Sequence, residues 1–263
     1  ATHMCVHMTS PVTLTLAAAA SFVALSYLQE ASCGLLILGT TLSYGLVYGA
    51  LKATREPPIA RQSEWRERQV STVNAVLLVC GSLLCFAEWP TYDASEGWIS
   101  QGLAYWPVTF AALFVGYLQW DVLWMLYHSS LHFDELAHHL LFIAVTHYVL
   151  WGRYFARPFA WLSVTELSTP FLNCRWFLAA TGSKGRAYDT CSLLFASAFL
   201  ATRALGYGMG LVDLWLARDL WRPAHWGLYV VIALVHAGYA LNLVWASKVV
   251  GAARRAMKSG HRE

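Results

Sequence analysis

Charged residues are scarce in this chain. Asp, Glu, Lys and Arg make up only 13% of its 263 residues, and 57% are hydrophobic, whereas about 25% charged residues is usual for a soluble domain. The regular alternation of apolar and polar residues that marks the strands of an outer-membrane barrel is also missing. The composition therefore predicts an all-α integral membrane protein, a polytopic transmembrane helical bundle.

Several common functional signatures are absent as well. No P-loop, GxGxxG or GxSxG pattern occurs in a suitable context, and the six cysteines form no CxxC pair. We interpret the cysteines as small buried hydrophobic residues. Basic residues gather beside membrane segments, at 52–68 and 254–262. This pattern indicates which ends of the membrane segments face the cytosolic side. No nucleic-acid partner is expected.

Apolar segments follow one another along the whole chain, and each is long enough to cross a hydrocarbon core of about 30 Å. We expect them at 11–28, 32–51, 70–87, 105–126, 136–152, 157–180, 187–212 and 226–250. Residues 11–51 are broken only at Gln29-Glu30, so the bundle has about 7–8 spans.

One polar linker divides the chain. Residues 52–69 contain Pro57-Pro58 and five Lys or Arg residues, which predicts a break that faces the cytosol or its organellar equivalent. We expect N-terminal transmembrane segments at 1–51, a transmembrane domain at 70–250 and a basic tail at 251–263.

A cluster of histidines and carboxylates stands at the start of one apolar segment. Its members are His128, His132, Asp134, Glu135, His138 and His139. A di-iron site would need further histidine clusters that this chain lacks, so we expect no metal. A single ion held by some of His128, His132, His138 and Asp134 stays an alternative. The His138-His139 pair begins a span, where histidine can act as a general base or acyl carrier.

Polar side chains also interrupt the apolar segments, and such groups are functional candidates in a membrane protein. They include Asp121, Glu166, Asn173, Arg175 and Arg203. Pro170 should kink its helix beside Glu166. Arg175 could pair with Asp121 or Glu166, and Arg203 requires an anion, either a carboxylate or a lipid phosphate. A neutral network that only ties helices together would give the same pattern.

These residues, in this order and spacing, resemble the TLC-domain family. The motifs are Trp65-Arg-Glu-Arg68-Gln-Val70-Ser71, Gly116-Tyr117 with Asp121, Glu135 before His138-His139, Glu166-Leu-Ser-Thr-Pro-Phe-Leu-Asn-Cys-Arg175-Trp, and Arg203. The resemblance covers roughly residues 62–250. The family includes TRAM translocon proteins, Lag-type ceramide synthases and lipid-homeostasis proteins, and this chain is most similar to the TLC-domain-containing subgroup.

The resemblance implies a six-helix core around a lipid-facing cavity. It makes His138 and His139 the acyl-transfer residues, with Asp121 beside them, and makes Glu166, Asn173, Arg175 and Arg203 their polar surroundings and substrate contacts. Two departures stand out. Residues 187–205 lack a further His-Asp…Asp motif of ceramide synthases, and Asn74 stands where the family often has histidine.

Two functions are therefore expected. The first is a lipid-metabolism or lipid-homeostasis protein that uses histidine-dependent acyl transfer, with no resident cofactor and with acyl-CoA or a phospholipid as donor. The second is a non-catalytic lipid-binding or accessory subunit of a larger membrane complex. Partners are membrane lipids and, in the second case, other membrane proteins. The family implies the endoplasmic reticulum; because the chain begins at Ala1, a mitochondrial or other organelle membrane is the alternative.

Overall fold

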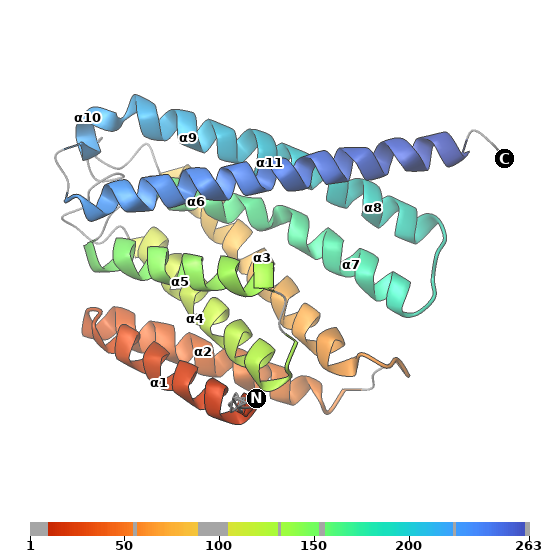
Figure 1. Cartoon of the computed structure of the whole chain (residues 1–263), viewed down its shortest axis with the longest axis horizontal. Coiled ribbons are helices and arrows are strands. Elements are labelled where there is room, and N and C mark those ends of the chain that lie inside the picture. Colours follow the sequence, from red (N-terminus) through yellow and green to blue (C-terminus); the bar gives the residue numbers. More distant parts are fainter. Residues whose placement is uncertain are drawn as a thin grey trace, which may run out of the picture. The chain divides into compact units, whose positions relative to one another are not determined.

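A computed structural model describes residues 10–54, 57–88, 105–130, 133–152, 156–222 and 225–260. These ranges are helical and contain no strand (Figure 1), which confirms the predicted all-α class. The elements are α1 (Pro11–Tyr27), α2 (Ala31–Leu51), α3 (Gln62–Glu88), α4 (Tyr105–Tyr127), α5 (Phe133–Gly152), α6 (Ala156–Ser163), η2 (Val164–Ser168), α7 (Thr169–Ala180), α8 (Arg186–Phe199), η3 (Leu200–Gly206), α9 (Tyr207–Leu216), α10 (Arg218–Trp221) and α11 (Gly227–Gly260).

Five helices in the described ranges are long and apolar enough to cross a membrane. They are α2, α3, α4 from Trp106, the run from α8 to α9, and α11 as far as Arg255. Helix α1 is apolar but shorter. The other two predicted spans correspond to α5, which opens with Asp134 and Glu135, and to the run α6–η2–α7, which is irregular at its centre. The protein is an integral membrane protein.

The predicted polar linker is helical in its second half. Helix α3 begins at Gln62, because Pro57-Pro58 interrupts only the first half, and Arg68 pairs with Glu64 one turn earlier on the same face, with Nη2 and Oε1 3.0 Å apart. The C-terminal helix α11 likewise continues into the predicted tail, to Gly260.

The chain folds as two compact units. The first unit contains Ala1–Val47 and Ala111–Gly152. In it a short turn joins α1 to α2 (Figure 1), and Ile37, Ala112 and Val115 form a fully buried core. Gly116 allows α4 to approach α2, since a Cβ atom at this position would lie 2.6 Å from Cβ of Thr40.

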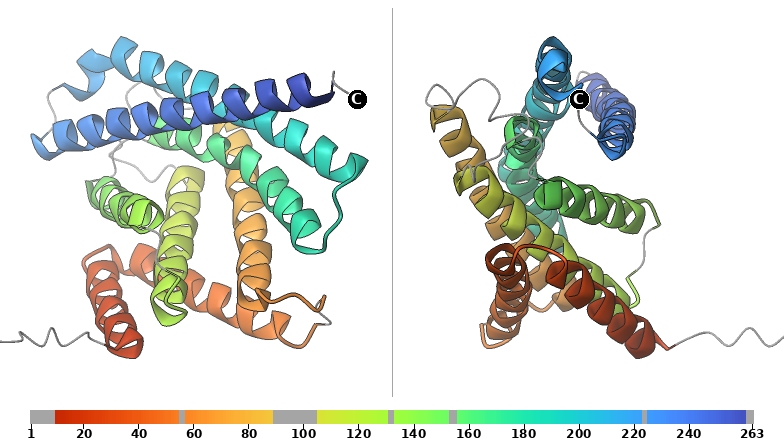
Figure 2. Two further views of the ribbon diagram at one scale, coloured as in Figure 1. Left: turned by 45° about the vertical axis from the view of Figure 1, so that its right-hand side comes forward. Right: turned by 90° about the vertical axis from the view of Figure 1, so that its left-hand side faces the viewer.

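The second unit contains Tyr48–Phe110 and Arg153–Glu263. Helix α3 packs along α6, η2 and α7, and the antiparallel α7 and α8 are joined by a short turn. Figure 2 shows α11 running beside the α8–η3–α9 helix. Tyr207 donates to the Val235 carbonyl of α11, and Tyr239 of α11 donates to the Ala204 carbonyl of η3, at 2.8 and 3.1 Å.

Two helices of the second unit change pitch. Residues Val164–Ser168 form the 3₁₀ segment η2 directly before the helix that contains Pro170. Proline has no N–H to donate to the carbonyl four residues earlier, so the α-helical ladder cannot continue through Glu166. The irregularity predicted at Pro170 is therefore the 3₁₀ segment η2. Residues Leu200–Gly206 form the π-helical segment η3, for which the sequence has no comparable signal.

Candidate functional site

The first candidate site joins α4 to α5 in the first unit. The Nε2 atom of His139 lies 3.3 Å from Oδ2 of Asp121. Both residues are buried, with exposed fractions of 8% and 4%. Asp134 and Glu135 occupy the first turn of α5, where carboxylates favour the positive end of the helix dipole. The predicted catalytic residues Asp121 and His139 are therefore in direct contact.

His138, the other half of the histidine pair, faces a different direction. Adjacent residues diverge by about 100° around a helix, and the two imidazole rings are nearly perpendicular, with centroids 5.8 Å apart. His138 is partly exposed and its ring packs on Phe142, one turn along α5, at 4.7 Å. His139 is the member of the pair that contacts Asp121.

The pairing with Asp121 sets the chemistry that His139 can perform. When a carboxylate accepts the Nε2–H hydrogen bond of a neutral imidazole, the lone pair is on Nδ1. The Nδ1 atom of His139 is itself buried, so only a group that enters the bundle can give it a proton. The carboxylate then stabilises the imidazolium. His139 and Asp121 together have the parts of a general base.

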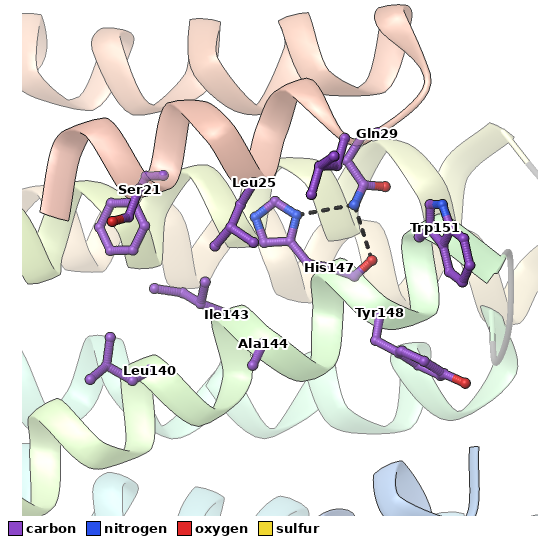
Figure 3. Close-up of a pocket in the computed structure, with 11 residues that line it drawn as sticks. Ser21, Leu25, Gln29, Leu140, Ile143, Ala144, His147, Tyr148 and Trp151 are labelled. Carbon is purple, nitrogen blue, oxygen red and sulfur yellow. Dashed lines mark hydrogen bonds between the residues drawn. The ribbon is translucent and has the colours of Figure 1, made fainter. Parts of the chain in front are cut away.

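A second buried histidine in the first unit is held by two amides. The Nδ1 atom of His147 lies 3.2 Å from Nε2 of Gln29, and its Nε2 atom lies 3.1 Å from Nε2 of Gln119 (the contact to Gln29 is shown in Figure 3). A neutral imidazole has one donor and one acceptor nitrogen, so one of the two amides must present its oxygen. Gln119 also accepts from Thr41 at 3.0 Å.

An open apolar groove lies beside this histidine. It has a volume of about 650 Å³ and is lined by α1 and α5, with Leu25, Leu140 and Ile143 along it and Gln29, His147 and Trp151 toward one end (Figure 3). Neither Gln29 nor Gln119 was predicted to be a site residue. The signal in the sequence was an uncharged amide in the membrane region, at the break between two apolar segments for Gln29 and two residues before Asp121 for Gln119.

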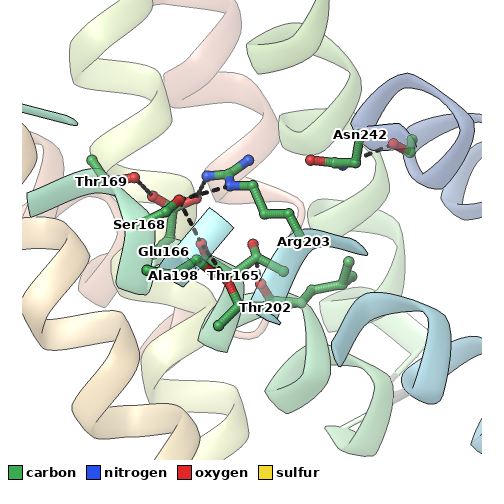
Figure 4. A network of polar contacts seen from close by, with 10 residues as sticks. Thr165, Glu166, Ser168, Thr169, Ala198, Thr202, Arg203 and Asn242 are labelled. Atoms are coloured by element: carbon green, nitrogen blue, oxygen red, sulfur yellow. Dashed lines mark hydrogen bonds and ion pairs between the residues drawn. The ribbon is translucent and has the colours of Figure 1, made fainter. Parts of the chain in front are cut away.

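The second unit contains the ion pair of Glu166 with Arg203. The Nη2 atom of Arg203 lies 2.9 Å from Oε1 of Glu166, and Nε of Arg203 donates to Ser168 at 3.2 Å (Figure 4). Thr169 donates to the other carboxylate oxygen at 2.7 Å. The anion expected for Arg203 is thus a carboxylate of the protein. Glu166 stands on the 3₁₀ segment and Arg203 on the π segment.

Asn242 of α11 points toward the guanidinium group of Arg203 in Figure 4. It is 6% exposed, and its amide nitrogen donates to the Gly238 carbonyl at 2.8 Å. Its Oδ1 atom is buried and receives no hydrogen bond from the described part of the chain. A buried acceptor in this state costs about 1–3 kcal/mol.

Asn173, predicted to bind substrate, ties α7 to α3. Its Oδ1 atom accepts from Nη1 of Arg68 at 3.1 Å, and its Nδ2 atom donates to the Arg68 carbonyl at 3.1 Å and to Thr72 at 3.0 Å. Both amide hydrogens and one oxygen lone pair are used. Glu166, on the 3₁₀ segment, contacts Arg203, whereas Asn173, on α7, contacts Arg68.

Arg175 does not pair with Glu166, the candidate carboxylate of its own unit. Its guanidinium group lies over the ring of Tyr188, 5.2 Å from the centroid. Glu166 binds Arg203 and Asp121 binds His139. Arg175 therefore contributes to the contact between α7 and α8.

The histidine cluster forms no metal site within the described ranges. No group of three or more His, Cys, Asp or Glu side chains there is arranged to hold an ion. His128 packs its ring on Trp124, with centroids 4.8 Å apart. His132 lies outside the described residues.

Residues 64–251 match the TLC domain family. The chain belongs to this family. TLC domain-containing protein 4 of Xenopus tropicalis is 33% identical over 134 residues, which cover 49% of this chain and 49% of that protein. TLC domain-containing protein 4-A of Xenopus laevis is 29% identical over 161 residues, or 56% of this chain and 60% of that protein.

A third TLC-domain relative covers more of the chain. TLC domain-containing protein 4-B of Danio rerio is 29% identical over 225 residues, which are 81% of this chain and 74% of that protein. The chain spans about half the length of the Xenopus tropicalis relative. No solved structure matches this chain. The TLC resemblance and the subgroup predicted from the motifs are confirmed.

Proposed function

We propose that this TLC-domain protein transfers an acyl group to or from a membrane lipid, with His139 as general base. The contact of His139 with Asp121 carries the proposal. Ionisable groups inside a membrane bundle are costly and are kept where they serve substrates or proton transfer. A buried carboxylate that fixes one nitrogen of an imidazole leaves the other able to take a proton.

The proposed reaction needs one proton acceptor and no metal ion. A hydroxyl or amine of the acceptor lipid attacks the acyl carbonyl of the donor, and His139 takes the proton of the attacking group at Nδ1. The carbonyl re-forms as the bond to the leaving group breaks, and the imidazolium returns the proton to that group. Asp121 stabilises the imidazolium between these events.

The donor, membrane and partners belong to the same proposal. Acyl-CoA or a phospholipid supplies the acyl group, and membrane lipids are the acceptors. We propose the endoplasmic reticulum as the membrane, as the family resemblance implies, with a mitochondrial or other organelle membrane as the alternative. Imaging of the tagged full chain beside markers of both membranes distinguishes them.

A second candidate function rests on the groove between α1 and α5. The groove has a volume of about 650 Å³ and an apolar lining, which suits a lipid chain. The amides of Gln29 and Gln119 provide hydrogen-bond partners for both ring nitrogens of His147, so this imidazole needs no substrate to satisfy it. On this alternative the protein is a non-catalytic lipid-binding or accessory subunit, and the contact of His139 with Asp121 ties α4 to α5.

The lipid composition of membranes that contain the protein separates these candidates. Full-length wild type, His139→Ala and the control His225→Ala are expressed at equal levels in cells that lack the endogenous protein, and lipids are quantified by mass spectrometry. Acyl transfer predicts that wild type and His225→Ala change the acyl composition of a lipid class and that His139→Ala does not.

The opposite pattern supports the accessory function. If His139→Ala restores the same lipid composition as wild type, the transferase proposal is wrong. If no variant alters lipids but removal of the protein dissociates a membrane complex, the accessory function is supported instead.

A further inference from the structure

Two cysteines of the second unit face each other across the α7–α8 hairpin. The sulfur atoms of Cys174 and Cys191 are 2.8 Å apart. The two cysteines lie at similar distances from the turn of the hairpin, since Cys174 is six residues before the end of α7 and Cys191 is five residues after the start of α8. The hairpin geometry therefore holds the two sulfur atoms together.

Both thiols lie near the polar end of the hairpin. The two cysteines are only partly buried, and Asp189 and Thr190, next to Cys191, are exposed. The connecting turn contains Lys184, and Arg186 begins α8. Small anionic reagents can approach such a basic, solvated end. Cys85, by contrast, is buried.

We propose that Cys174 and Cys191 are an oxidisable pair that forms an intramolecular disulfide with a small-molecule disulfide such as oxidised glutathione. The thiolate of one cysteine attacks the reagent and releases one reduced thiol. The second cysteine then attacks the mixed disulfide and releases the other reduced thiol. Two protein thiols are oxidised to one disulfide, one reagent disulfide is reduced to two thiols, and the two protons pass to the released thiolates.

The bond would fix the contact between α7 and α8. Asn173, which binds Arg68, precedes Cys174 directly, and α8 leads into the π segment that holds Arg203. The contact of Arg175 with Tyr188 spans the same two helices. Oxidation would hold α7 against α8 by a covalent link in addition to these contacts, without using either candidate catalytic residue.

Thiol counting on the full chain in native membranes tests the proposal. Membranes are incubated with oxidised or reduced glutathione, denatured, and labelled with a maleimide that shifts mobility once per free thiol. Wild type has six cysteines, so the reduced sample should show six shifts and the oxidised sample four. Mass spectrometry of the digest should identify a peptide pair linked through Cys174 and Cys191.

Three variants complete the test. Cys174→Ser and Cys191→Ser should each lose the two-thiol change, and Cys80→Ser, with an exposed cysteine on α3, should keep it. The wild-type measurement needs no variant to fold. Six free thiols in oxidised wild type, a linked peptide with a different cysteine, or an unchanged two-thiol loss in Cys174→Ser would each overturn the proposal.

Discussion

Glu166 and Arg203 form an ion pair between two irregular helical segments, with Nη2 and Oε1 2.9 Å apart. Their side chains are 22% and 13% exposed, and Ser168 and Thr169 complete the hydrogen bonding. The pair is partly buried, so removing one partner leaves an uncompensated charge in the bundle, which destabilises the protein more than replacing both partners.

This pair gives the first prediction. Arg203→Met should lower the unfolding free energy by about 3 kcal/mol, because Glu166 is then left charged in the bundle. The double variant Glu166→Gln/Arg203→Met should recover more than half of the loss. Unfolding in detergent, followed by tryptophan fluorescence, measures both. Losses that simply add in the double variant would show that the two side chains do not interact.

The close packing of α11 on α9 gives the second prediction. A Cβ atom on Gly208 would lie 2.7 Å from the hydroxyl of Tyr239, so Gly208→Ala should lower the melting temperature. Tyr239→Phe in the same chain should restore part of it, because the clashing oxygen is removed. Gly49→Ala is the control, since nothing lies within 4 Å of its Cβ position, and it should raise stability by up to about 1 kcal/mol.

Asn173 gives the third prediction. Asn173→Leu should destabilise the protein by about 2–3 kcal/mol, because it removes three hydrogen bonds and leaves Arg68 and Thr72 without this partner. Chemical unfolding of the purified protein measures the change. Stability equal to that of wild type would mean that the amide does not join α7 to α3.

Asn242 is a matched residue for which the opposite result is expected. It is buried, as Asn173 is, with exposed fractions of 6% and 2%, but its Oδ1 atom accepts no hydrogen bond from the described residues. Asn242→Leu should therefore leave the unfolding free energy unchanged or raise it, because an unsatisfied acceptor is replaced by an apolar group. The same unfolding assay applies, and a loss as large as that of Asn173→Leu would contradict the assignment.

Much of the helical layout could be predicted from the sequence, because long apolar segments and their polar breaks are local signals. Each of the eight segments has a helical counterpart, and Pro170 indicated the irregular segment η2. The π segment around Arg203 had no such signal. Its geometry depends on packing against neighbouring helices, which a single apolar stretch does not reveal.

The candidate sites were predictable only in part. Asp121 and His139 could be selected because charged and titratable groups are rare in spans. Their contact, however, joins two helices, and the sequence equally allowed Arg175 as the partner of Asp121. The amides of Gln29 and Gln119 were missed because a single glutamine in a membrane segment has an ordinary structural explanation. Only the folded structure shows that both amides contact the same residue, His147.

Acyl transfer by purified full-length protein in lipid nanodiscs tests the central claim most directly. Wild type, His139→Gln and Asp121→Asn receive a labelled acyl-CoA or a labelled phospholipid, and the labelled lipid product is quantified. Asp219→Asn is the carboxylate control, since its side chain is 82% exposed, and melting temperatures confirm that all proteins are folded. We predict transfer by wild type and Asp219→Asn, and a loss of about 10²–10⁴-fold in folded His139→Gln, the usual contribution of a general base. Transfer by folded His139→Gln at the wild-type rate would contradict the account.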